Sequence, residues 1–182
     1  LVVTLNLKNS NPHYNPDKAH HTLTGFKNPY LNQDSQRKNF SDLFKMMTTE
    51  RPDPKPQMEK DLSIDSIIQK INNNKSFITW IGHSTMLLHA NGKTILTDPI
   101  FSDRCSPVQF LGPKRYSYPT IYIESLPKID LVVISHNHYD HLDKNSVKSL
   151  GKDSATVWYV PLGLKKWFNQ LNIKNVIELD WF

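Results

Sequence analysis

Residues 129–143 read Ile-Asp-Leu-Val-Val-Ile-Ser-His-Asn-His-Tyr-Asp-His-Leu-Asp. The first six are mostly apolar and favour a buried β-strand. Four potential metal ligands follow within six positions, namely His136, His138, Asp140 and His141. Packing does not explain this cluster, because imidazoles and a carboxylate are costly to bury without partners. A divalent cation such as zinc resolves the conflict, since it binds neutral imidazole nitrogen and ionised carboxylate oxygen. The stretch therefore predicts a metal site at the end of a strand.

The spacing within the cluster suggests two metals rather than one. His136 and His138 are two residues apart, so both side chains can turn toward one ion just beyond the strand. Asp140 and His141 follow as the chain turns toward the next helix, and their side chains can reach a second ion nearby. Two metals about 3.5–4 Å apart are the arrangement of many phosphoesterases. The alternative is a surface loop whose histidines bind nothing, and the apolar strand before the cluster argues against it.

Length and composition fit a globular domain with a core of its own. The chain has 182 residues, of which 38% are hydrophobic and 21% are charged. The net charge of +5 is modest and the basic residues are spread along the chain, so we expect no nucleic-acid partner. A single cysteine, Cys105, excludes an internal disulfide framework and a cysteine-based zinc knuckle.

Cellular location is left open by the sequence. No apolar run approaches the roughly 20 residues of a membrane-spanning helix. The chain begins Leu-Val-Val-Thr-Leu, which is either the remainder of a removed signal or anchor or an arbitrary starting point. We expect a protein that is cytoplasmic or peripherally bound to a membrane.

The pattern divides the chain near residue 60. Residues 1–60 predict an N-terminal arm, extended over residues 6–34, with a short helix at 36–49 and a proline-rich linker at 51–56. Residues 61–182 predict a domain of mixed α/β (α+β) class, with helices packed on a mixed sheet. The predicted strands are 77–81, 85–90, 93–97, 129–134, 156–160 and 176–179. The predicted helices are 63–72, capped by Ser63, then 142–150 and 164–171. Asn91-Gly92 predicts a hairpin, and residues 99–127 predict a long functional loop.

Several further stretches resemble one family. They are 79–85 (TWIGHST), 96–102 (LTDPIFS), 106–115 (SPVQFLGPKR), 125–130, 135–143, 160–164 and 176–181, together with His20-His21 and 25–29 in the arm. The cluster is similar to that of the metallo-β-lactamase superfamily. The other stretches resemble, within that superfamily, the N-acylphosphatidylethanolamine-hydrolysing phospholipase D family and its bacterial relatives.

The resemblance implies an αββα sandwich with two zinc ions. His136 and His138 would bind the first zinc, and Asp140 and His141 would bind the second and belong to the catalytic centre. In the family a bridging hydroxide attacks a phosphodiester, and the phospholipase branch releases an N-acylethanolamine and a phosphatidic acid. The implied partner is thus a phospholipid or another phosphodiester, with peripheral membrane association.

The resemblance also implies that residues 61–182 are only the N-terminal half of the sandwich. The family's remaining zinc ligands follow in the second half, and no histidine occurs after His141. We therefore expect this stretch to be inactive alone, and to self-associate or to pair with a missing C-terminal half. Two alternatives stay open. One is a non-catalytic interaction module, and the other is a hydrolase of the same fold acting on a lactone, an amide or a nucleic acid.

Six further residues are candidates for roles around the metals. Asp98, at a strand end, could hold a ligand imidazole in the right tautomer, or it could cap a turn. His83 lies in a family motif and could support the ligands without binding metal, or it could make an ordinary structural hydrogen bond. The resemblance implies that the long loop borders the lipid-binding cleft. Four of its residues are therefore candidates for substrate contact, namely Gln109, Phe110, Leu111 and Arg115. The alternative for these four is a packed surface loop with solvated charges.

Overall fold

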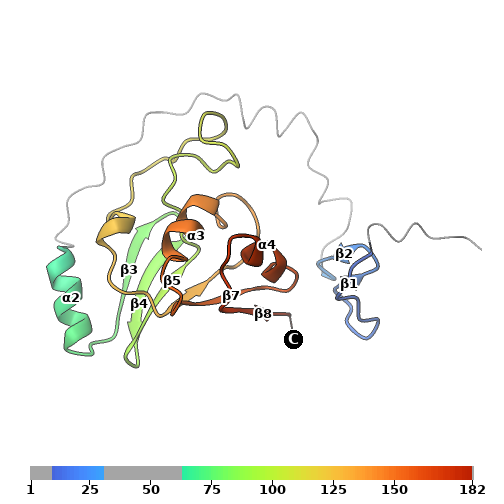
Figure 1. The fold of residues 1–182 in the computed structure, drawn as a ribbon, viewed down its shortest axis with the longest axis horizontal. Coiled ribbons are helices and arrows are strands. Elements are labelled where there is room, and N and C mark those ends of the chain that lie inside the picture. Colours follow the sequence, from blue (N-terminus) through green and yellow to red (C-terminus); the bar gives the residue numbers. More distant parts are fainter. Residues whose placement is uncertain (1–9, 31–62, 182) are drawn as a thin grey trace, which may run out of the picture. The chain divides into compact units, whose positions relative to one another are not determined.

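The computed structural model of the protein describes residues 10–30 and 63–181, which belong to two separate units (Figure 1). Residues 10–30 contain turns and a two-stranded antiparallel hairpin, β1 (His21–Thr22) with β2 (Gly25–Phe26). This segment is therefore more folded than the extended arm that the sequence suggested. The expected helix at 36–49 and the linker at 51–56 lie outside the described residues.

The second unit is built on a six-stranded mixed sheet. Its strands follow the order of the sequence: β3 (Phe77–Gly82), β4 (Thr85–Ala90), β5 (Lys93–Thr97), β6 (Leu131–Val133), β7 (Val157–Pro161) and β8 (Val176–Leu179). The first three pair antiparallel, and β5 to β8 pair parallel. The mixed sheet and all six predicted strands are confirmed, with ends that differ by at most two residues.

Helices pack on one face of this sheet. They are α2 (Ile64–Asn72), α3 (Lys144–Leu150) and α4 (Lys165–Gln170), and a short 3-10 helix, η3 (Ile123–Ser125), lies in the long loop. Each α-helix contributes a fully buried residue, Ile67, Val147 and Phe168, to one core with the inward side chains of the strands. Burying each such side chain contributes about 1.5–3 kcal/mol, so this core dominates the stability of the unit.

Local sequence signals explain the boundaries of several elements. Asn91 and Gly92 adopt φ angles of 50° and 71°, the left-handed pair that a tight hairpin turn needs. The Ser63 side chain accepts a hydrogen bond from Ser66 N at 3.2 Å and begins α2. The predicted hairpin and the predicted cap are therefore both confirmed.

The opposite face of the sheet carries apolar side chains that are open to solvent. Ile78 is 66% exposed, and Trp80, Val133, Ile177 and Leu179 are also exposed. Strand register places them all on the face turned away from the helices. An apolar sheet face is normally covered by another layer, so this unit presents a surface suited to a second layer. Among the described residues, no helix is long and apolar enough to cross a membrane.

Candidate metal centre

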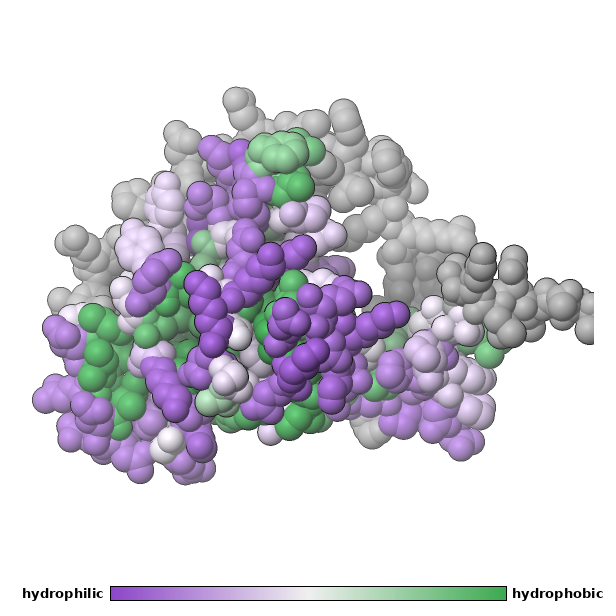
Figure 2. All heavy atoms as spheres, in the orientation of Figure 1, coloured by the Kyte–Doolittle hydropathy of each residue, from purple (hydrophilic) through white to green (hydrophobic). Residues whose placement is uncertain are grey.

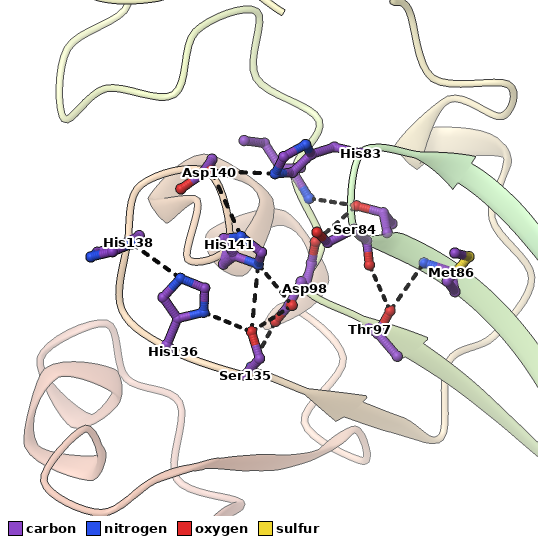
Figure 3. A network of polar contacts seen from close by, with 12 residues as sticks. His83, Ser84, Met86, Thr97, Asp98, Ser135, His136, His138, Asp140 and His141 are labelled. Carbon is purple, nitrogen blue, oxygen red and sulfur yellow. Dashed lines mark hydrogen bonds and ion pairs between the residues drawn. The ribbon is translucent and has the colours of Figure 1, made fainter. Parts of the chain in front are cut away.

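The cluster forms where the ends of two parallel strands meet. Thr97 of β5 pairs with Val133 of β6, and Asp98 N donates to Val133 O at 2.9 Å. The chain beyond β5 therefore supplies Asp98 at the edge from which residues 135–141 leave β6 (Figure 3). The carboxyl ends of parallel strands are where open α/β sheets bind their ligands.

The Asp98 side chain links the residues at this edge of the sheet by hydrogen bonds. Its side chain is buried, and it accepts hydrogen bonds from Ser135 N and from Ser135 Oγ, both at 2.7 Å. Its Oδ2 also lies 2.9 Å from His141 Nδ1. A carboxylate in this position accepts the Nδ1 proton, so the lone pair of His141 is left on Nε2, the atom that points away from Asp98. The structure thus places Asp98 where the sequence suggested that it orients a ligand.

Ser135 orients the neighbouring ring in the same way. Its hydroxyl proton goes to Asp98, so its oxygen is free to accept from His136 Nδ1 at 2.9 Å. His136 Nε2 then faces His138 Nδ1 at 3.1 Å. Burial lowers the pKa of His136, and the rings of His141 and His138 lower that pKa further. The lowered pKa favours the neutral form of this imidazole, which is the form that can bind a metal ion.

His83 reaches the cluster from a third strand end. It lies in the turn between β3 and β4, and its Nε2 is 3.3 Å from Asp140 Oδ2. The same carboxylate oxygen is 3.7 Å from His141 Nε2. His83, Asp140 and His141 each offer one donor atom, and the three donors lie within 4.8 Å of one another. Figure 3 shows the three side chains converging above Asp98.

The segment after the cluster is held by its own hydrogen bonds. The backbone N–H groups of His141 and Leu142 both donate to His138 O, which closes the turn. Asp143 then begins α3 by accepting from Asn145 N at 3.1 Å. Its carboxylate also accepts from Ser102 N and Ser102 Oγ at 3.0 and 2.9 Å. The start of the long loop is thereby fixed to the helix that follows the histidine cluster.

The four loop candidates separate into two kinds. The amide of Gln109 bonds to the backbone N and O of Arg104, both at 3.1 Å. The Arg115 guanidinium donates to the carbonyls of Ile100, Phe101 and Ser117. Phe110, by contrast, is 83% exposed, and Leu111 is 50% exposed. In this structure Gln109 and Arg115 hold the loop together, while the two apolar residues project from it, and substrate contact by any of the four stays a prediction.

The arrangement fits a metal ion. Metal–nitrogen and metal–oxygen bonds of about 2.0–2.2 Å at tetrahedral angles separate neighbouring donor atoms by about 3.3–3.6 Å. The 3.1, 3.3 and 3.7 Å spacings given above lie close to that range. Two of the donor imidazoles also have their second nitrogen fixed by an oxygen, as metal-ligating histidines usually do. Ser135 was not among the predicted site residues, and its position directly between the strand and the first histidine was the one signal in the sequence that pointed to it.

Residues 77–181 match the model of a beta-lactamase superfamily domain. The chain is 37% identical over 158 residues to an N-acyl-phosphatidylethanolamine-hydrolyzing phospholipase D of Caenorhabditis elegans, covering 80% of this chain and 44% of that protein. It is 36% identical over 124 residues to a mitochondrial protein with the same activity in its name from Saccharomyces cerevisiae, covering 67% and 26%.

A metal-dependent hydrolase of Aeropyrum pernix is 37% identical over 86 residues, covering 46% of this chain and 30% of that protein. The chain thus spans less than half the length of each of these three relatives.

Proposed function

This chain belongs to the metallo-β-lactamase superfamily, and we propose that it supplies the first metal ligands of a zinc-dependent phosphodiesterase that acts on an N-acylated phospholipid. The observation that carries the proposal is the convergence of three strand ends on two adjacent sets of donors. His136 with His138 would hold one zinc, and Asp140 with His141 would hold the other. Asp98 and Ser135, which hydrogen-bond the imidazoles of His141 and His136, would present these rings to the ions.

The metals, when bound, supply a water that ionises near neutral pH and positive charge beside the phosphate. The residues of this chain orient the histidine side chains that would bind the metals. Asp98 fixes His141 with Nε2 toward Asp140, and Ser135 fixes His136 with Nε2 toward His138. Because Asp98 and Ser135 are themselves hydrogen-bonded to each other twice, all four side chains are placed before any ligand arrives.

The reaction proposed is hydrolysis of the phosphodiester bond on the ethanolamine side. Water adds to phosphorus, the bond from phosphorus to the ethanolamine oxygen breaks, and that oxygen gains a proton. The products are an N-acylethanolamine and a phosphatidic acid. The choice of substrate is supported by the activity in the names of the nematode and yeast relatives, each of which this chain covers only in part.

The loop gives this substrate class a physical rationale. Phe110 and Leu111 project from a loop that is fixed to the metal edge through Arg115 and Asp143. In Figure 2 hydrophobic atoms cover part of this loop, at the top of the view, beside polar ones. Exposed apolar side chains on a braced loop can enter the interface of a lipid surface, which supports peripheral membrane association.

The test is hydrolysis of N-acylphosphatidylethanolamine in vesicles, in water enriched in oxygen-18, by a purified and zinc-loaded protein in which this chain is joined to the C-terminal half that supplies the remaining zinc ligands. We expect one labelled oxygen in the phosphatidic acid and none in the N-acylethanolamine, detected by mass spectrometry. His138→Ala should reduce the rate by at least about a hundredfold, because it removes one donor of a two-histidine pair. Full activity of His138→Ala, or label in the N-acylethanolamine, would overturn the proposal.

A further inference from the structure

The edge of the sheet at which most strands begin lies opposite the metal centre. β3 and β5 are both antiparallel to β4, and β5 to β8 are parallel, so five strands run from this edge toward the metal edge. An exposed lysine begins each of these five strands or precedes its first residue by at most five positions. In strand order these lysines, called the lysine row below, are Lys75, Lys93, Lys128, Lys152 and Lys174.

We propose that the lysine row is a docking surface for an extended acidic segment of another protein. Neighbouring strands lie about 4.8 Å apart, so the six-stranded sheet spreads the row over about 24 Å. An extended chain rises about 3.3 Å per residue and turns alternate side chains to the same side. About seven residues, with acidic side chains facing the lysines, would therefore run the length of the row. This surface is separate from the metal centre, and its role does not depend on the proposed hydrolysis.

The lysine row has few negative charges beside it. Lys93 Nζ lies 3.7 Å from Asp130 Oδ1, and among the described residues it is the only amine of the row beside a carboxylate. Asp130 is also used within its own turn, because its Oδ2 accepts from Thr94 N at 2.9 Å. The other carboxylate in the turns that hold the row, Asp153, accepts from Ala155 N at 2.9 Å. Four of the five ammonium groups therefore have no described carboxylate beside them and can attract an acidic partner.

Hydrogen bonds between neighbouring turns fix the backbone beneath the lysine row. Asp130 N donates to Thr94 O and Val157 N donates to Asp130 O, both at 2.9 Å, which links the starts of β5, β6 and β7. Trp158 N donates to Asn175 O at 2.9 Å, which links β7 to the start of β8. The backbone positions of the lysines on these strands are thus set before a partner arrives. Binding then has to order side chains only, which lowers its entropic cost.

The composition of these turns favours an acidic protein segment over other anionic partners. The turns are residues 73–76, 91–93, 127–130, 151–156 and 172–175, and every exposed large apolar side chain of the second unit lies outside them. A single-stranded nucleic acid is usually held by exposed aromatic rings, and a membrane surface by apolar side chains that enter it. The turns offer exposed amides beside the lysines, which can donate hydrogen bonds to carboxylate or backbone oxygens. These amides belong to Asn73, Asn74, Asn91 and Asn175.

The experiment measures binding of a fluorescein-labelled heptaglutamate peptide to the purified chain by fluorescence anisotropy, at about 0.1 M salt. The row variant combines Lys75→Gln, Lys128→Gln, Lys152→Gln and Lys174→Gln. The matched control removes the same charge from exposed lysines of the long loop and of the first turns of α3 and α4, with Lys114→Gln, Lys144→Gln, Lys165→Gln and Lys166→Gln. Each exposed ion pair strengthens binding by about 1.4- to 5-fold, so the row variant should bind the peptide about tenfold more weakly or worse.

The control should stay within about twofold of wild type, because β5 alone separates the two edges by about 16 Å, beyond the screening length of about 10 Å. Equal weakening in the two variants would reveal general attraction to a basic protein and would overturn the inference, as would no binding of the peptide to wild type. Tighter binding of a single-stranded oligonucleotide or of phosphatidylserine vesicles, lost in the row variant, would overturn it too. Circular dichroism melts report that both variants fold. Neither metal binding nor hydrolysis enters these measurements, so the proposed function stands or fails separately.

Discussion

Asp98 Oδ2 lies 2.9 Å from His141 Nδ1, although 43 residues separate the two along the chain. The pair exists because β5 and β6 lie side by side and end at the same edge of the sheet. A buried carboxylate behind a ligand imidazole fixes its tautomer and raises its basicity. Removing the Asp98 carboxylate should therefore weaken metal binding.

Asp98→Asn should lower metal affinity by about 10- to 100-fold, because the amide no longer holds the Nδ1 proton of His141 as a carboxylate does. Zinc titration against a chelating indicator measures the change. Asp153→Asn is the matched control, since Asp153 is exposed and only accepts from Ala155 N in a distant turn. Equal affinities of Asp98→Asn and the control would contradict the role given to Asp98.

Asp143→Ala should destabilise the unit by about 2–4 kcal/mol, the sum of a lost helix cap, of the unpaired and partly buried donors of Ser102, and of the unpaired buried hydroxyl of Ser146. Urea unfolding of the metal-free protein measures the loss. Ser63→Ala removes one exposed cap from α2 and should cost only about 1 kcal/mol. If the two variants lost the same stability, the link from Asp143 to the loop would contribute nothing.

The lowered pKa of His136 makes stability depend on pH. Its unfolded pKa is about 6.5, and its folded pKa is lower because of burial and of the rings of His141 and His138. Between the two values the unfolded chain binds more protons, so stability rises with pH through this window. The contribution is complete above about pH 6.5 and is lost as the pH falls through the folded value.

Urea unfolding of the metal-free protein at several pH values tests this, with His136→Gln as the comparison. We expect a shallower rise in stability with pH for the variant near pH 6. An identical slope in the two proteins would exclude the contribution of His136.

The open face of the sheet predicts association. We expect the isolated 182-residue chain to self-associate with increasing concentration, since Ile78, Ile177 and Leu179 expose apolar surface on one side. Sedimentation velocity measures this, and Ile78→Lys should shift the population toward monomer without changing the circular dichroism. A single monomeric sedimentation boundary at every concentration, together with a cooperative thermal melt, would show that this sheet face is stable without a second protein layer.

Local signals in the sequence were enough for most of the sheet. The Asn91-Gly92 turn, the Ser63 cap and the apolar runs each act over a few residues, so they could be recognised without the fold. The contacts of Ser135 with Asp98 join residues 37 apart and depend on parallel pairing across the long loop. The close approach of His83 to Asp140 depends on a bulge and a left-handed turn, which no short-range pattern specifies. Residues 36–49, where a helix was predicted, lie outside the described part of the chain.

The most direct test of the metal centre is an anomalous diffraction map at the zinc edge from crystals of the zinc-loaded protein. Strong peaks should lie within about 2.0–2.2 Å of the donor atoms of His136 and His138, and of Asp140 and His141. Zinc bound elsewhere, or no peak at this edge of the sheet, would contradict the assignment.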